Sequence, residues 1–205
     1  DDKTIALQST LVEKEILLKE LNHRVKNNMQ TIISLIRLQR DEVKDKKIEE
    51  MFITIQNRIN AMNQLHQLLY TQNQDLSSIS PTEYFESIVS EIQQSTYSED
   101  IIVRYNIQAK VSTEQAVYCG LIVNELVTNC IKHAFLVNKG EIEISYFSEN
   151  NKNILVVRDN GIGISKNAND SLGMTLIKSL VEMNLNGALK IENNNGTLVQ
   201  IEWEE

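Results

Sequence analysis

Apolar residues in the first forty positions recur in steps of three, four and seven. This heptad-like spacing is typical of a helix that packs in a coiled or bundled arrangement, and it predicts a helix from about Thr4 to Asp41. The charged segment RDEVKDKK predicts a turn, and a second stripe predicts another long helix after it. The two stripes are Leu7, Leu11, Leu18, Leu21, Val25, Ile32 and Leu35, and then Ile48, Phe52, Ile55, Ile59, Met62, Leu65 and Leu69.

Two long helices joined by a short turn form an antiparallel hairpin. The two stripes are together too wide for one partner helix to cover, so a second copy of the hairpin would bury the remainder in a four-helix bundle. We therefore expect residues 1–72 to form a helical dimerisation domain, with the chain as a homodimer.

The pattern changes after residue 72. The polar, serine-rich segment 73–80 predicts a linker, and residues 81–205 mix strands with helices. A helix opens at Ser80–Pro81 and ends near Thr96, and another opens at Ser112 with Gln115 three positions later. A third is expected over 172–183, with strands over 101–107, 141–147, 154–158, 188–192 and 198–203. The fold class is thus α+β, with a sheet that carries helices on one face.

Composition narrows the function classes. The 205 residues carry a formal net charge of −8, which argues against a nucleic-acid-binding protein, since these usually present a basic face. No apolar run approaches the roughly 18 residues of a membrane span, so we expect no direct membrane contact and a cytoplasmic location.

Cys119 and Cys130 lie in one helical pattern and are expected to be buried, reduced thiols. Because the chain opens on Asp1 close to a helical pattern, we expect a fragment with an upstream part missing.

His23 is the first candidate for chemistry. If Leu18 and Leu21 occupy a and d positions, His23 falls at f, the outermost heptad position. Arg24, Lys26, Asn27 and Asn28 crowd the same turn with hydrogen-bond donors, which suits a phosphate. The alternative is an ordinary surface histidine. His66 lies near the second apolar stripe, and we expect a structural role for it.

The helix after Ser112 carries a second candidate group. Glu125, Asn129 and either Lys132 or His133 recur at helical spacing and share a face. A carboxylate, an amide and a cation on an otherwise apolar helix suit a metal–phosphate site, where the amide oxygen meets Mg²⁺ and the lysine meets phosphate oxygens. The alternative is a solvated helix face.

Two glycine-containing segments follow. In RDNGIG, Asp159 ends an apolar strand and can accept a hydrogen bond from an exocyclic amine such as that of adenine. Gly161 and Gly163 permit a close backbone approach or a turn with positive φ. In SLGMTLIKSL, Gly173 lies in the first turn of a helix, where exposed amides suit phosphate. Each segment alone is a weak signal, but their order and spacing strengthen one another.

Taken together, these segments resemble the transmitter module of a sensor histidine kinase, of the subclass whose phosphoacceptor box reads H-R-x-K-N-N. Residues 15–35 resemble that box, NELVTNCIKHAF the N box, RDNGIGI and SLGMTLIKSLVEMNLNGAL the two glycine boxes, and NGTLVQIEW the closing strand. The resemblance spans nearly the whole chain in the family's order. It implies a phosphoacceptor hairpin followed by a Bergerat-type (GHKL) α/β sandwich domain that binds ATP.

The resemblance also implies an activity: autophosphorylation of His23 from ATP with Mg²⁺, then transfer to an aspartate on a response regulator receiver domain, under control of an upstream sensor domain. In the implied site, His23 is the acceptor, and Asn129 is the Mg²⁺ ligand with Glu125 beside it. Lys132 and His133 lie in the nucleotide pocket, where Asp159 contacts adenine. The remaining residues of that pocket are Gly161, Gly163, Gly173 and Thr197. Arg24 departs from the acidic residue common after the acceptor. The lid between Asp159 and Gly173 is also short.

Three alternatives remain open. The first is a phosphotransfer scaffold with weak or no ATP binding, and the second is another ATPase of the same superfamily. The third is a coiled dimerisation module without chemistry. The N box and the glycine boxes argue against a scaffold without ATP binding. His23 and the hairpin argue against another ATPase of the superfamily, and the polar face at Glu125 argues against a module without chemistry.

Overall fold

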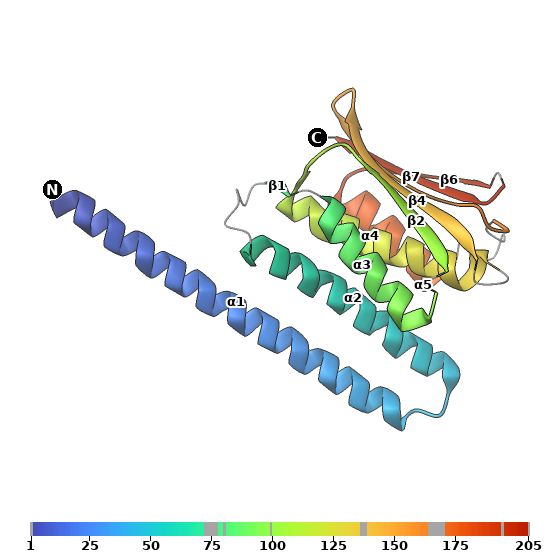
Figure 1. The fold of residues 1–205 in the computed structure, drawn as a ribbon, viewed down its shortest axis with the longest axis horizontal. Coiled ribbons are helices and arrows are strands. Elements are labelled where there is room, and N and C mark those ends of the chain that lie inside the picture. The colour runs from blue at the N-terminus through green and yellow to red at the C-terminus, as the bar shows by residue number, and fades with distance from the viewer. Residues whose placement is uncertain are drawn as a thin grey trace. The chain divides into compact units, whose positions relative to one another are not determined.

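A computed structural model describes residues 2–71, 78–79, 81–98, 100–135, 139–163, 171–193 and 195–204. The chain divides into two compact units, Asp1–Gln74 and Asp75–Glu205. In the first unit, helix α1 (Asp2–Glu42) and helix α2 (Lys46–Thr71) form the antiparallel hairpin (Figure 1). The predicted hairpin is therefore confirmed.

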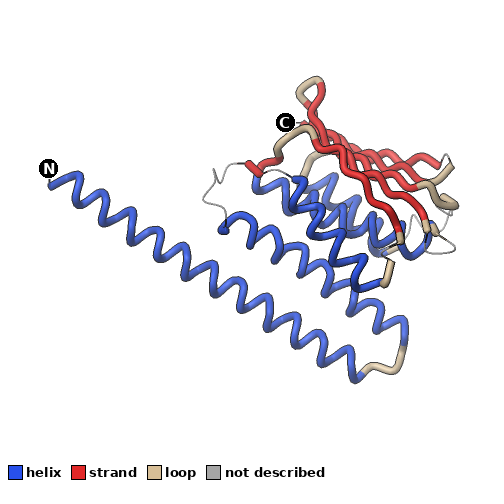
Figure 2. Tube along the Cα trace, in the orientation of Figure 1, coloured by secondary structure: helices blue, strands red, loops and turns tan. Residues whose placement is uncertain are grey.

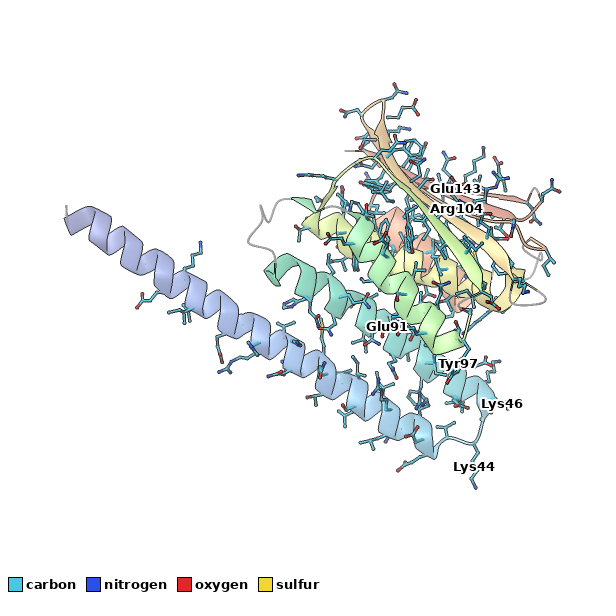
Figure 3. All side chains as sticks on the ribbon, in the orientation of Figure 1. Lys44, Lys46, Glu91, Tyr97, Arg104 and Glu143 are labelled. Atoms are coloured by element: carbon cyan, nitrogen blue, oxygen red, sulfur yellow. The ribbon has the colours of Figure 1, made fainter. Side chains whose placement is uncertain are left out.

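The turn between α1 and α2 is only three residues long, Val43–Asp45. The Asp45 carboxylate accepts a hydrogen bond of 2.8 Å from the Lys47 amide, so it caps the start of α2. Lys44 and Lys46 flank this aspartate with exposed side chains (Figure 3). A short capped turn forces the helices to pack side by side.

The apolar stripe of α1 divides into two faces. Ile33 is buried at 8% exposure, and Val25, Met29 and Ile36 are half-buried. Leu21, Ile32 and Leu35 instead expose 57%, 46% and 57% of their surface. One part of the apolar surface therefore faces α2 and another part does not, because successive residues lie about 100° apart around a helix and only one face meets α2. The side chains of Leu7, Leu11, Leu18 and Leu69 lie outside the described residues.

The second unit is a layer of helices on a sheet (Figures 1 and 2). The five-stranded sheet has the order β2-β4-β5-β7-β6, parallel between β2 and β4 and antiparallel elsewhere. Its strands are β2 (Ile101–Ile107), β4 (Gly140–Glu149), β5 (Lys152–Asp159), β6 (Ala188–Asn193) and β7 (Thr197–Glu204). The helices are α3 (Pro81–Thr96), α4 (Thr113–Asn129) and α5 (Leu172–Ser179), with π-helical turns η1 (Cys130–Ala134) and η3 (Leu180–Asn184) continuing α4 and α5.

A second, two-stranded sheet pairs β1 (Ser78–Ile79) with β3 (Val111–Ser112). Strand β1 lies within the segment predicted as a linker, so part of that segment is strand. Ser112 accepts a hydrogen bond from the Gln115 amide and caps α4, as the sequence predicts. The predicted cap at Ser80 lies outside the described residues. Within the described part of the chain, no helix carries an apolar stretch long enough to cross a membrane.

The core lies between the helices and one face of the five-stranded sheet. Alternate residues of each strand point to opposite faces, and on β4, β5 and β7 those toward the helices are almost entirely buried. On the strands these include Ile142, Ile144, Tyr146, Leu155, Val157, Ile201 and Trp203, each 2% exposed or less. The opposite face carries exposed charge, with Arg104 of β2 beside Glu143 of β4 in the parallel register (Figure 3). The predicted α+β sandwich is confirmed.

Candidate functional site

A cavity of about 460 Å³ opens between the helices and the sheet of the second unit. Segments far apart in the sequence form its walls: the end of α4 with η1, the end of β5 with the following turn, the start of α5, and β7. Most of its described lining is apolar, and a few polar groups converge on it. The lining residues are Leu126, Asn129, Cys130, His133, Ala134, Val157, Asp159, Ile162, Gly163, Ser171, Met174, Thr197 and Val199.

Helix α4 positions Glu125 and Asn129 one turn apart. Glu125 is buried at 4% exposure, and its Oε1 accepts a hydrogen bond of 3.3 Å from the Asn124 side chain. Asn129 is half-buried and lines the cavity. Glu125 does not belong to the described lining. The predicted shared face therefore places the amide at the cavity and the carboxylate beside it.

Gly173 explains how α5 approaches this face. A Cβ atom added at Gly173 would lie 2.7 Å from Glu125 Oε2 and 3.8 Å from Asn129 Nδ2. Any larger residue would press on a buried carboxylate, so glycine permits the first turn of α5 to sit against α4. Ser171 caps this helix by accepting a hydrogen bond from the Met174 amide. Gly173 itself is absent from the described lining but shapes the wall behind it.

Lys132 and His133 both lie in the π-helical turn η1. A π-helical turn adds about one residue to the usual helical turn, so the residues after Asn129 rotate relative to an α-helix. Both side chains are exposed, but only His133 is among the described residues that line the cavity. The sequence left the choice between these two cations open, and the structure brings His133 to the cavity.

Asp159 is the buried charge of the site. It ends β5, is 2% exposed and lines the cavity. The Gly161 amide donates a hydrogen bond of 2.8 Å to Asp159 Oδ1, and the Cys130 thiol donates to Oδ2 at 3.5 Å. Burial and the neighbouring Asp159 charge raise the pKa of the Cys130 thiol well above its usual value. A neutral donor therefore faces each carboxylate oxygen.

The glycine turn after Asp159 is held against η1. The Ile162 amide donates a hydrogen bond of 3.0 Å to the Ala134 carbonyl. A Cβ atom at Gly161 would lie 2.3 Å from that same carbonyl oxygen, and Gly163 adopts a φ of 82°. Both glycines are thus required by the backbone path. Residues 164–170, where the short lid is predicted, lie outside the described residues.

Strand β7 closes the opposite wall. Thr197 is its first residue, is 6% exposed and lines the cavity together with Val199. Five of the predicted residues of the second unit meet at the cavity: Asn129, His133, Asp159, Gly163 and Thr197. Sequence reasoning missed the polar role of Cys130. It directly follows Asn129, but its contact with Asp159 depends on the packing of α4 against β5.

His23 lies on α1 in the first unit. Its side chain is exposed, as its heptad position predicts. Its neighbour Arg24 forms an ion pair of 2.8 Å with Glu20, one helical turn earlier, and both side chains are more than half exposed. Such a surface pair is worth little, so the guanidinium can leave it for a stronger anion. His66 is half-buried, and burial lowers its pKa.

Comparison with known families agrees with this geometry. Residues 20–96 match the family described as "Histidine kinase". Residues 116–205 match the family described as "Histidine kinase-, DNA gyrase B-, and HSP90-like ATPase". The two families occur here in consecutive order over most of the chain. The chain belongs to the histidine kinases.

Curated relatives support a transmitter module of this family. The chain is 29% identical over 188 residues to the sensor histidine kinase PdtaS of Mycobacterium tuberculosis, a match that covers 87% of the chain and 37% of that protein. It is 29% identical over 202 residues to the blue-light-activated histidine kinase 2 of Erythrobacter litoralis, which covers 90% of the chain and 56% of that protein. The module thus spans between about a third and about half of the length of these relatives.

Solved structures agree with the fold. The histidine kinase domain of the Erythrobacter litoralis EL346 blue-light-activated kinase matches with a TM-score of 0.66 at 25% identity, over 94% of the module and 93% of that chain. The catalytic domain of histidine kinase ThkA matches with a TM-score of 0.53 at 16% identity, over 62% of the module and 94% of that chain. The second match shows the fold alone.

Proposed function

We propose that the chain is the cytoplasmic transmitter part of a two-component sensor histidine kinase. It autophosphorylates His23 from Mg²⁺-ATP and passes the phosphoryl group to an aspartate of a response regulator receiver domain. The observation that carries the proposal is Asp159: a buried carboxylate, held by two donors, in a mostly apolar cavity. The apolar lining suits a flat purine ring, and the carboxylate suits the exocyclic amino group of adenine.

The rest of the cavity suits the remaining parts of the nucleotide. Leu126, Val157, Met174 and Val199 offer apolar contacts to the ring, and Thr197 a hydroxyl next to it. The start of α5 presents backbone amides that suit phosphate oxygens. His133, and by resemblance Lys132, supply nitrogen donors. These donors would offset the negative charge of a bound triphosphate in a protein that is itself acidic.

The donor set also suits Mg²⁺. Within the described residues, no group of three His, Cys, Asp or Glu side chains could hold a metal by itself. Mg²⁺ usually keeps waters and phosphate oxygens and takes only one or two ligands from the protein. The Asn129 amide oxygen fits that role, and Glu125 behind it would orient the amide or accept a proton. When bound, Mg²⁺ would neutralise charge on the phosphates.

His23 is suited to be the acceptor because its ring is exposed. A neutral imidazole nitrogen attacks the γ-phosphorus of ATP; an N–P bond forms, the P–O bond to ADP breaks, and the proton on the other ring nitrogen is released. Arg24 and Lys26 then stabilise the transferred phosphoryl group by charge. The exposed ion pair of Arg24 with Glu20 leaves the guanidinium available for this contact.

The hairpin supports a homodimer. Leu21, Ile32 and Leu35 on α1 form an exposed apolar stripe, and Ile48, Met51 and Ile55 form one on α2, with exposures from 38% to 57%. Contiguous apolar surface of this kind is typical of a protein–protein interface. A second hairpin would cover both stripes in a four-helix bundle. An upstream sensor domain would then control the dimer.

Phosphorylation assays test the proposal. The chain is incubated with γ-labelled ATP and Mg²⁺, and the labelled protein is exposed to acid and to alkali. We expect label that is stable in alkali and lost in acid, as a phosphorylated histidine requires, and no label when EDTA removes the metal. Nucleotide binding without any label would favour another ATPase of the superfamily, and no nucleotide binding would favour the phosphotransfer scaffold.

A further inference from the structure

The two oxygens of the Asp159 carboxylate are held by different elements. The Gly161 amide, in the turn after β5, donates to Oδ1 at 2.8 Å. The Cys130 thiol, at the end of α4, donates to Oδ2 at 3.5 Å. The terminal torsion of an aspartate is broad and has no strong preference of its own. Its orientation must therefore come from such contacts.

We infer that Cys130 is a positioning residue that fixes the Asp159 carboxylate to receive the exocyclic amino group of a bound purine. The inference rests on the proposed function, because it assigns Asp159 to that amino group. Cys130 itself lines the cavity, so it acts at the wall where the purine would bind. Each carboxylate oxygen keeps a second lone pair for the ligand.

The chemistry of the thiol suits this role. A thiol is a weak donor that behaves otherwise as a small apolar group, so it can orient a carboxylate without competing strongly for it. The thiol lies 3.5 Å from Asp159 Oδ2 inside a buried part of the site. Losing this donor would leave Asp159 free to rotate and would weaken its contact with an amino group.

Cys119 provides a matched control. It lies eleven residues before Cys130, about three turns earlier along the same helical segment. It is fully buried and is not among the described residues that line the cavity. Burial raises its pKa to about 12. Replacing either cysteine by alanine removes the same buried sulfur, but of these two described residues Cys130 is the one that donates a hydrogen bond to Asp159.

The test compares ATP with purine riboside triphosphate, which lacks the amino group. Dissociation constants are measured by calorimetry for the wild type and for Cys130→Ala, Cys130→Ser and Cys119→Ala. We expect the wild type to prefer ATP about tenfold, since a hydrogen bond to a charged group is worth about a factor of ten or more. Cys130→Ala should lower the preference to about threefold or less. Cys130→Ser, which keeps a donor, and Cys119→Ala should stay within about twofold of the wild type.

A purely structural role would lower affinity for both nucleotides and leave the preference unchanged. Cys130→Ala with the wild-type preference would therefore overturn the inference while the proposed function stands, and so would loss of the preference in Cys130→Ser. A wild type that binds both nucleotides equally would overturn the inference and the adenine role of Asp159 together. If Cys130→Ala does not fold, Cys130→Val removes the donor without leaving a cavity and is read in the same way.

Discussion

Lys132 and His133 are neighbours in the sequence and both are exposed, but only His133 is among the described residues that line the cavity. Both lie in the π-helical turn η1, which changes the angular spacing of the residues after Asn129. We expect His133→Ala to weaken ATP binding about threefold or more, since it removes a hydrogen-bonding group from the cavity. Lys132→Ala should weaken ATP binding less than His133→Ala does. Calorimetric titration of both variants decides the point, and a larger loss for Lys132→Ala would reassign the phosphate contact to the lysine.

Asp159→Asn should weaken ATP binding roughly tenfold or more. Losing a charged acceptor in a closed site costs about 1.5–3 kcal/mol. The amide would also turn its NH₂ group toward one of the two donors, the Gly161 amide or the Cys130 thiol. The measurement is a calorimetric titration with ATP, with Asp100→Asn as a control for loss of an exposed acid in the same unit. Unchanged affinity in the Asp159 variant would rule out its role at adenine.

Asn129→Ala should abolish autophosphorylation and leave the fold intact. Asn129 is only half-buried, so its removal leaves little cavity, while the proposed Mg²⁺ ligand is lost. Glu125→Gln should slow phosphoryl transfer more than it weakens binding, because Glu125 lies behind the cavity wall. Initial rates with γ-labelled ATP, together with circular dichroism, provide the check. Labelling of the Asn129 variant at the wild-type rate would exclude this helix face as the metal site.

His23→Gln should remove all label from the protein, whereas His66→Gln should keep it. His23 is exposed at an outer heptad position, while His66 is half-buried. His133 belongs to the cavity and is not a free acceptor. Both substitutions exchange an imidazole for an uncharged side chain of similar size, which makes them a matched pair. Label retained in His23→Gln would point to another acceptor and contradict the proposed phosphoacceptor.

Ile32→Glu and Leu35→Glu should dissociate the homodimer without a large loss of helicity. Both side chains are about half exposed on the hairpin, so a charge there is tolerated by a monomer but not by a buried interface. Light scattering at micromolar concentration measures the mass, with Gln39→Glu as a control at an exposed polar position. A wild-type monomer with normal helicity would contradict the dimer and favour a module that acts as a single chain.

The elements themselves were largely predictable from local pattern. The hairpin, the cap at Ser112 and the strand Ile101–Ile107 follow from helical and alternating periodicity, which act over a few residues. Asn150 and Asn151, in the turn between β4 and β5, adopt φ values of 53° and 63°, which asparagine tolerates better than most residues. Such local chemistry is visible in a sequence because the contacts involved are close along the chain.

The site residues were predictable as separate motifs, each ambiguous alone. Helical spacing predicted that Glu125 and Asn129 share a face, and the end of an apolar strand marked the Asp159 carboxylate. The resemblance to histidine kinases joined these motifs into one site. What the sequence could not predict was which side of α1 meets α2, because Ile32 and Ile33 are equally apolar and only packing buries Ile33. Strand β1 was also missed, since two residues carry no periodicity of their own.

The sequence by itself therefore determined the helices and strands, the chemistry of the donors and their order along the chain. The tertiary structure alone decided three further points. It placed His133, and not Lys132, among the described residues that line the cavity. It pressed Gly173 against Glu125, and it brought the Cys130 thiol to Asp159 across 29 positions of the chain. Contacts of this kind depend on how a helix packs on a strand, and nothing in the local pattern of either segment encodes that distance.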